Sequence, residues 1–170
     1  MNKNKVNKEI FINKKIRKAV RTFLINDNKV VATKYKTEKN LDYYDIPGGK
    51  IEDAETSLEA SIREFKEETG IQIISQQYKG NVIIEYPNMI FDFDVYIVKE
   101  YDGIPSEFDE NDSMWIDIDE LFKKDKKFAS IEILKYINLE NIKLKIYVDE
   151  NHNINKIKME SKWFKWMKIK

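Results

Sequence analysis

The sequence predicts a single α/β domain, and three observations lead to that prediction. With 170 residues and 42% hydrophobic side chains, the chain can bury one sizeable core. Apolar and polar residues alternate in several short stretches, as in strands, and these surround one helical stretch with clear start and stop signals. No internal repeat or low-complexity linker interrupts the chain, so one domain is the simplest prediction.

The first half of the chain predicts a hairpin, a loop and the approach to a helix. Residues 20–25 alternate weakly, residues 26–28 suit a turn, and residues 29–35 supply a second strand. Residues 36–44 are polar and predict a loop. Residues 46–50 then form a tight, glycine-marked approach to the helix, in which the backbone can come close to a ligand.

The second half predicts further strands, two short helical segments and a late hairpin. The clearest strand covers residues 90–98, where four apolar side chains alternate with Asp92 and Asp94. Residues 142–148 and 154–159 flank a polar turn and predict the hairpin. The other expected strands are 71–75, 82–86 and 115–118, and the helical segments are 119–124 and 131–137.

The composition excludes several classes of site. The chain has no cysteine, which excludes disulfides, thiolate metal sites and a cysteine nucleophile. The single histidine, His152, lies in the polar turn, where we expect it to be solvated. No apolar run is long enough for a membrane span, and no secretory signal is recognisable at the N-terminus, so we expect a cytoplasmic protein without a membrane partner.

Charge is balanced overall but unevenly distributed. There are 30 basic and 30 acidic side chains, with a basic stretch at residues 1–18 and an acidic one at 102–120. The basic start favours an anionic partner, but a solvated tail is the simpler interpretation, and we expect no nucleic-acid partner. The aromatic tail at residues 163–167 is expected to pack on the domain, with a dimer contact or a pocket cover as alternatives.

The central helix is delimited at both ends by local signals. Thr56 followed by Glu59 is the signature of a capping box, and Gly70 suits the left-handed position that ends a helix. One stripe of the helix, at 100° per residue, carries side chains that we expect to face the core. These side chains are Leu58, Ile62, Phe65 and Thr69.

Another arc of the same helix carries Glu64, Glu67 and Glu68. Like charges at this spacing repel, and acids near the C-terminal end of a helix oppose its dipole. A divalent cation such as Mg²⁺ would supply the missing positive charge, while a solvated acidic face is the alternative. The carbonyl group of Gly48 is placed to join the metal shell, and Lys50 is a candidate for contact with a phosphate.

The segment around these residues reads Gly49-x5-Glu55-x7-Arg63-Glu64-Phe65-x-Glu67-Glu68-x-Gly70-Ile71. It resembles a complete Nudix box, the motif of the Nudix hydrolases, and the strand order over residues 18–138 is also similar to that family, in particular to MutT-type members. The resemblance implies an α/β/α sandwich with a mixed β-sheet, in which the box forms a loop–helix–loop. It divides the chain into a basic extension (1–18), the Nudix domain (19–138) and a C-terminal extension packed on it (139–170).

The resemblance also implies roles for individual residues. Glu64, Glu67 and Glu68 would be the catalytic carboxylates that hold Mg²⁺ or Mn²⁺ with the Gly48 carbonyl, and Glu64 would also take the proton from the attacking water. A further metal-binding acid is expected before residue 115. Glu110 is our choice for it, with Asp109 and Glu107 as alternatives. The box residues with structural roles would be Gly49, Glu55, Arg63 and Gly70, with Glu55 and Arg63 paired to brace the loop.

The implied activity is Mg²⁺-dependent hydrolysis of a diphosphate linkage in a nucleoside diphosphate derivative. We expect a nucleoside triphosphate, normal or oxidised, that is cleaved to the monophosphate and pyrophosphate without a covalent intermediate. ADP-ribose or a nucleotide sugar is the first alternative, since the position of Pro87 after the box also occurs in ADP-ribose hydrolases. The second alternative is an inactive Nudix-like module that binds a nucleotide or RNA. The oligomeric state stays open.

The residues that contact the substrate are less well defined by the sequence. Ser130 stands at the nearest match to the position where MutT has a base-reading asparagine, which is a departure from that pattern. An aromatic side chain could stack on a base, although core or loop packing is the alternative for each candidate. The aromatic candidates are Tyr43, Tyr44 and Phe128, and Lys34 and Lys36 are candidates for phosphate contact.

Overall fold

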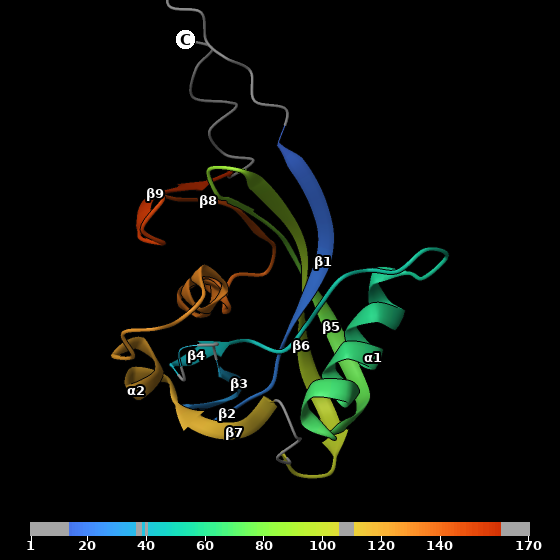
Figure 1. Ribbon diagram of the computed structural model, residues 1–170. Coiled ribbons are helices and arrows are strands. Elements are labelled where there is room, and N and C mark those ends of the chain that lie inside the picture. The colour runs from blue at the N-terminus through green and yellow to red at the C-terminus, as the bar shows by residue number, and fades with distance from the viewer. Residues whose placement is uncertain (1–13, 37–38, 40, 106–110, 161–170) are drawn as a thin grey trace, which may run out of the picture.

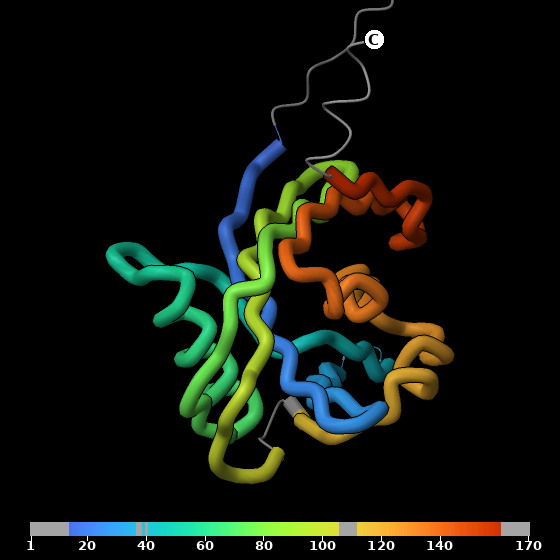
Figure 2. Tube along the Cα trace, turned by 180° about the vertical axis from the view of Figure 1, so that it is seen from behind, coloured from blue at the N-terminus to red at the C-terminus, as the bar shows by residue number. Residues whose placement is uncertain are grey.

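A computed structural model describes residues 14–36, 39, 41–105 and 111–160, and the structural statements that follow concern these residues. Two β-sheets form the centre of the molecule (Figures 1 and 2). Helix α1 (Ser57–Thr69) covers one face of the larger sheet, and helix α2 (Ile118–Phe122) and the 3₁₀ helix η1 (Ala129–Tyr136) lie on the other side. The layers therefore follow the predicted α/β/α order.

The larger sheet is mixed, as predicted. Its strand order is β1-β6-β5-β8-β9. The pairs β1/β6 and β5/β8 are parallel, whereas β5/β6 and β8/β9 are antiparallel. The last two strands are the predicted late hairpin. The strands are β1 (Lys15–Phe23), β5 (Gln72–Glu85), β6 (Met89–Asp102), β8 (Ile142–Val148) and β9 (Ile154–Met159).

The smaller sheet corrects two predictions made for the first half of the chain. Only the short β2 forms a hairpin with β3, because β1 instead pairs in parallel with β6. The polar segment expected as a loop contains a strand, β4, whose residue Tyr43 is opposite Tyr35 of β3. Its backbone pairing with β3 outweighs its polar composition. The strands are β2 (Ile25–Asn26), β3 (Lys29–Lys36), β4 (Asp42–Asp45) and β7 (Asn111–Asp117).

Helix α1 begins and ends where the sequence predicts, but it buries a different set of residues. Both hydrogen bonds of the Thr56–Glu59 capping box are present, and Gly70 caps the C-terminus with φ 74°. Leu58 is 48% exposed, which contradicts the expectation that it faces the core. It lies in the first turn, next to the exposed loop that enters the helix. The small Ala60 is buried instead, next to Val20 of β1 and Tyr96 of β6.

One expected pair of strands is corrected by irregular hydrogen bonding, whereas an expected helical segment is present. The strands expected at 71–75 and 82–86 are one long strand, β5, with register shifts between Ile73 and Gly80. Such bulges break the two-residue period that sequence analysis depends on. The helical segment expected at 131–137 is present as the 3₁₀ helix η1, which buries Ile131 and Ile133. No helix in the described ranges is both long and apolar enough to cross a membrane.

Candidate active site

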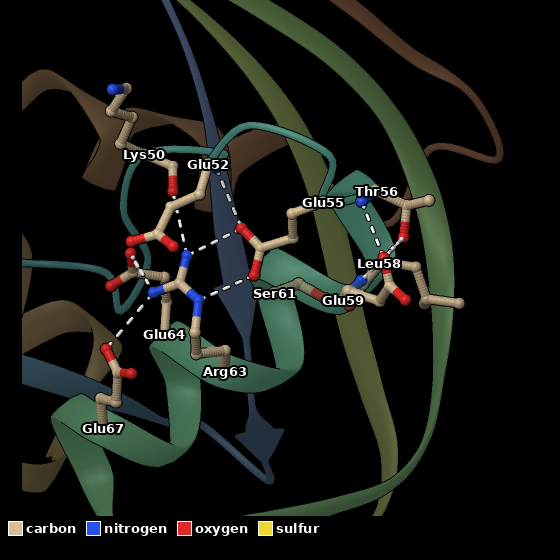
Figure 3. A network of polar contacts seen from close by, with 10 residues as sticks. All are labelled: Lys50, Glu52, Glu55, Thr56, Leu58, Glu59, Ser61, Arg63, Glu64 and Glu67. Carbon is tan, nitrogen blue, oxygen red and sulfur yellow. Dashed lines mark hydrogen bonds and ion pairs between the residues drawn. The ribbon is translucent and has the colours of Figure 1, made fainter.

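Arg63 organises the acidic side of α1 (Figure 3). Its guanidinium group donates to both carboxylate oxygens of Glu55, at 2.7 Å and 2.9 Å. It also donates to Glu64 at 2.8 Å, to Glu67 at 3.3 Å and to the carbonyl oxygen of Lys50 at 3.2 Å. A planar guanidinium suits such a two-point contact with a carboxylate. Arg63 therefore ties the loop before the helix to two of the three predicted metal ligands.

The Glu55–Arg63 pair stays charged over a wide pH range. Hydrogen bonds from Arg63 lower the pKa of Glu55 to about 2, helped by the backbone N–H of Glu52. The same carboxylate raises the pKa of Arg63 above its ordinary value. The pair is therefore present as an ion pair at neutral pH.

The glycine pair before the helix is required by close approaches on two sides. A Cβ atom on Gly48 would lie 2.0 Å from the carbonyl oxygen of Val20 in β1. A Cβ atom on Gly49 would lie 2.3 Å from the carboxyl carbon of Glu64. The loop also pairs with β1, since the N–H of Val20 donates to the carbonyl of Gly49 at 2.9 Å. Any side chain at position 49 would therefore displace the Glu64 carboxylate or the loop.

Glu68 occupies a more enclosed position than the other two glutamates. It accepts a hydrogen bond of 2.6 Å from the hydroxyl of Tyr35 and one of 2.9 Å from the N–H of Gly48. Burial raises its pKa to about 7, against the lowering effect of these two hydrogen bonds. Burial likewise raises the pKa of Tyr35, next to the Glu68 charge.

The three glutamates have separate partners. Glu64 is 16% exposed and Glu67 is 60% exposed, and both contact Arg63, whereas Glu68 contacts Tyr35. Within the described ranges, no three acidic or histidine side chains converge on one point as metal ligands. The fourth predicted acid, Glu110, and its alternatives Asp109 and Glu107 lie outside the described residues.

The donor chemistry of this region nevertheless fits a hard divalent cation. Three carboxylates lie along one flank of α1, beside the backbone of the glycine loop. Within the described part of the chain, no hydrogen bond to the Gly48 carbonyl oxygen is recorded. Glu68 is a largely enclosed carboxylate, and burial disfavours its charged form. A cation nearby would favour the charged form again. Oxygen ligands of this kind are those that Mg²⁺ prefers.

A cavity of about 640 Å³ lies beside the helix, and Tyr35 connects the two. Tyr35 lines the cavity and its hydroxyl donates to Glu68. The other walls come from β1, β4, β5, β6, η1 and the β8–β9 turn. Aromatic rings provide much of the lining, including the parallel rings of Phe91 and Phe93, whose centroids are 5.5 Å apart. Tyr86, Phe128 and the imidazole of His152 also contribute rings to the lining.

The most enclosed polar group of the cavity lining is an ion pair between Arg21 and Asp45, with a distance of 2.8 Å. Ser130 donates a hydrogen bond to the same carboxylate, and so does the N–H of Ile46 at 2.7 Å. Burial raises the pKa of Asp45, while Arg21 lowers it. The guanidinium of Arg21 also lies over the Phe93 ring, 4.6 Å from its centroid. The cavity thus offers fixed polar groups between aromatic walls, as small-molecule sites do.

Only some of the predicted substrate residues lie at the cavity. Phe128 and Ser130 line the cavity, and Tyr43 packs on Phe128 with 5.3 Å between the ring centroids. The others lie elsewhere. Tyr44 packs under Lys124, Lys34 pairs with Asp42 and Asp112, and Lys36 and Lys50 are exposed.

Sequence analysis missed several residues of the cavity. His152, expected only as a solvated turn residue, is exposed but lines the cavity. Arg21, Asp45 and Tyr86 line the cavity as well, and none of them was expected as a substrate residue. The polarity of Arg21 within an otherwise apolar strand segment was the one available signal. Its partner Asp45 is 24 residues away, and nothing in the sequence joins the two.

Comparisons with known proteins agree with the fold and the box. The family model described as NUDIX domain matches residues 15–137, so the chain belongs to the Nudix family. Among solved structures, the mutator MutT protein from Bacillus halodurans aligns with a TM-score of 0.70 at 18% identity. That alignment covers 85% of this chain and 97% of the other. A likeness at this identity shows the shared Nudix fold.

Two curated relatives match shorter stretches. An "8-oxo-dGTP diphosphatase" from Haemophilus influenzae is 33% identical over 73 residues, which is 43% of this chain and 54% of the relative. An "Oxidized purine nucleoside triphosphate hydrolase" from Danio rerio is 33% identical over 76 residues, which is 44% of this chain and 49% of the relative. The chain thus spans about half the length of these two relatives.

Proposed function

We propose that this protein is a Mg²⁺-dependent hydrolase that cleaves a purine nucleoside triphosphate, normal or oxidised, to the monophosphate and pyrophosphate. One observation carries the proposal. The carboxylate side of α1 is connected through the Tyr35–Glu68 hydrogen bond to a large aromatic cavity. Such an arrangement has room for a diphosphate at the helix and a nucleoside in the cavity. The names of the two curated relatives support this substrate class, and the cytoplasmic location expected from the sequence is part of the proposal.

Glu64, Glu67, Glu68 and the Gly48 carbonyl would hold the Mg²⁺, with Mn²⁺ as a substitute. When bound, the ion would offset charge on the phosphates and make a water molecule more acidic. Glu64 would accept the proton of the attacking water at its carboxylate. Arg63 would keep that carboxylate in position, because its guanidinium is itself fixed by Glu55. Lys50 stays a candidate for phosphate contact, since its exposed side chain is free to reach a ligand.

The cavity would hold the nucleoside. Aromatic walls suit a planar base, and the Arg21–Asp45–Ser130 group offers a donor and an acceptor to its edge. The side of the cavity toward Tyr35 would then direct the phosphates to α1. This orientation agrees with the positions of the acidic helix and the aromatic walls.

The first experiment measures the products of a nucleotide panel with Mg²⁺, separated by chromatography. The panel contains normal and oxidised dNTPs, ADP-ribose and a nucleotide sugar. We expect monophosphate and pyrophosphate from the triphosphates. Glu64→Gln should slow turnover about 100-fold or more, as expected for loss of a proton acceptor, and Glu68→Gln should also reduce it strongly. Both variants should keep the wild-type circular dichroism spectrum.

Glu100→Gln is the matched control, because it removes one acidic charge from an exposed position of β6. It should keep wild-type turnover. Undiminished activity of both helix variants would refute the proposed site, whereas faster cleavage of ADP-ribose than of any triphosphate would correct the substrate.

A further inference from the structure

The cavity has a wall that the Nudix domain does not provide. The family match ends at residue 137, but Asp149, Glu150 and His152 of the β8–β9 turn line the cavity. The larger sheet curls so that this hairpin overhangs η1 on the side opposite α1 (Figures 1 and 2). The segment after the domain therefore closes part of the site that we assign to the nucleoside.

The hairpin is firmly attached to the rest of the sheet. Strand β8 pairs in parallel with β5 from Gly80 to Glu85, and its inward-facing residues Ile142, Leu144 and Ile146 are buried. Glu85 of β5 accepts hydrogen bonds from Lys145 at 2.9 Å and from Lys14 at 2.6 Å. The turn is thus held in a fixed place relative to the cavity.

The turn itself is built by a dense set of hydrogen bonds. One carboxylate oxygen of Asp149 accepts from the N–H groups of Asn151 and Asn153, both at 2.9 Å. The N–H of Asp149 donates to the carbonyl of Asn153 at 2.9 Å, and that of His152 donates to the carbonyl of Asp149 at 3.0 Å. The Asp149 side chain is therefore engaged in the turn, which leaves His152 to present its ring.

His152 stands at a position where glycine or asparagine is the ordinary choice. Its φ is 63°, in the left-handed region, where a Cβ atom is unfavourable. Its imidazole ring lies against Tyr86, with centroids 6.0 Å apart and planes at 59°. At His152 this conformation coincides with a ring that lines the cavity and contacts Tyr86, and it is this combination that points to a use of the side chain.

The charges of the lining indicate which part of a nucleotide fits beside His152. Three acidic residues, Asp45, Asp149 and Glu150, line the cavity together with one arginine, Arg21, which pairs with Asp45. This excess of negative charge disfavours a phosphate and leaves the aromatic rings as the main attraction. A planar, uncharged ring matches this end of the cavity.

We propose that His152 is a specificity-determining residue whose ring, together with Tyr86, packs on the nucleobase of the substrate. The proposal rests on the proposed function, since it places the base in the cavity. It adds a recognition element from outside the Nudix domain, and it assigns binding of the base, not the chemical step, to this element.

The experiment measures equilibrium binding of a purine nucleoside monophosphate and of ribose 5-phosphate by calorimetry, without turnover. His152→Gly should weaken binding of the monophosphate about tenfold, in the range found when an aromatic partner of a base is removed. It should leave the weaker binding of ribose 5-phosphate unchanged. Glycine adopts a positive φ without steric strain, so the melting temperature of the His152→Gly variant should be equal to or above that of the wild type.

His152→Phe is the matched variant, for which we expect retained binding and no gain in stability. It keeps a ring against Tyr86 but retains the Cβ atom at φ 63°, so binding of the monophosphate should stay within about threefold of wild type while stability does not rise. In turnover with a triphosphate, His152→Gly should raise KM and leave kcat within about twofold, because the proposal assigns the ring to binding of the base and the carboxylates of α1 to the chemical step.

Two results would overturn the inference. One is unchanged affinity of His152→Gly for the monophosphate. The other is an equal loss for ribose 5-phosphate, which would assign His152 to the sugar-phosphate part or to folding. Binding and turnover also separate the two proposals. A wild type that binds the base through His152 but hydrolyses no nucleotide would refute the proposed function alone.

Discussion

Arg63 shows how one side chain allows several acids to share one side of a helix. Glu64 and Glu67 would repel each other at this spacing, but both contact the Arg63 guanidinium. The same group is fixed by a two-point contact with Glu55. A lysine could supply the charge but not the planar fork, so it could not hold three carboxylates in this arrangement.

The Glu55–Arg63 pair predicts a pH dependence of stability. The folded-state pKa of Glu55, about 2, lies below its ordinary value of 4.5. A lowered carboxylate pKa stabilises the fold fully above the ordinary value, and this stabilisation is lost as pH falls from about 4.5 to about 2. Glu55→Gln should therefore be less stable than wild type at pH 7, and the difference should shrink over that window.

Urea unfolding of both proteins at several pH values between 7 and 2.5 measures this difference. Glu100→Gln again serves as the control for the loss of one acidic side chain. If the difference in unfolding free energy between Glu55→Gln and wild type stayed constant down to pH 2.5, it would contradict the assigned ion pair.

Residues of the site could be predicted from the sequence only where their spacing is local. The box glutamates, Arg63 and the glycine pair fall within one loop and one helix, so their positions follow from helical geometry. The Tyr35–Glu68 hydrogen bond joins residues 33 positions apart, and it depends on how β3 is placed against α1. Pairings of this kind are set by tertiary packing, which no local pattern encodes.

At the scale of elements, α1 is the one whose limits the sequence defines best. Its capping box and its glycine cap are local signals, and the structure has both. Strand β4 was missed because its pairing with β3, not its composition, makes it a strand. Strand β5 was divided in two because its bulges interrupt the alternation.

The capping box predicts the effect of a substitution at the start of α1. Thr56→Ala removes the side chain that accepts from the N–H of Glu59 and donates to its carboxylate. We expect a loss of about 1 kcal/mol in the free energy of unfolding, measured with urea. Thr56→Ser keeps the hydroxyl and should recover most of it. Equal losses for the two variants would contradict a capping role.

At the scale of the whole molecule, the C-terminal hairpin shares one core with the Nudix domain. Ile142, Leu144 and Ile146 of β8 belong to the same buried cluster as Phe23 and Val95. The sequence predicted the two strands with their observed limits, but not that β8 would pair in parallel with β5. The long separation between these strands along the chain explains why.

This shared core predicts that the hairpin and the domain unfold together. Ile146 is fully buried, and Ile146→Ala should cost about 2–5 kcal/mol of unfolding free energy, as expected for a cavity in a core. Ile74→Ala, at a position that is 63% exposed, should change it by less than about 0.5 kcal/mol. Far-ultraviolet circular dichroism and intrinsic fluorescence should report a single, coincident transition. Separate transitions would mean that the hairpin folds independently.

The distribution of the cavity walls along the chain has a practical consequence. The bond-breaking carboxylates are assigned to residues 64–68, whereas the wall formed by residues 149–152 comes from a short turn far downstream. A library randomised at Glu150 and His152 would leave the Glu55–Arg63 brace and the glycine loop intact. If the proposed function holds, selection from such a library on different triphosphates should change which nucleotide is preferred, while the carboxylates proposed for the chemical step stay unaltered.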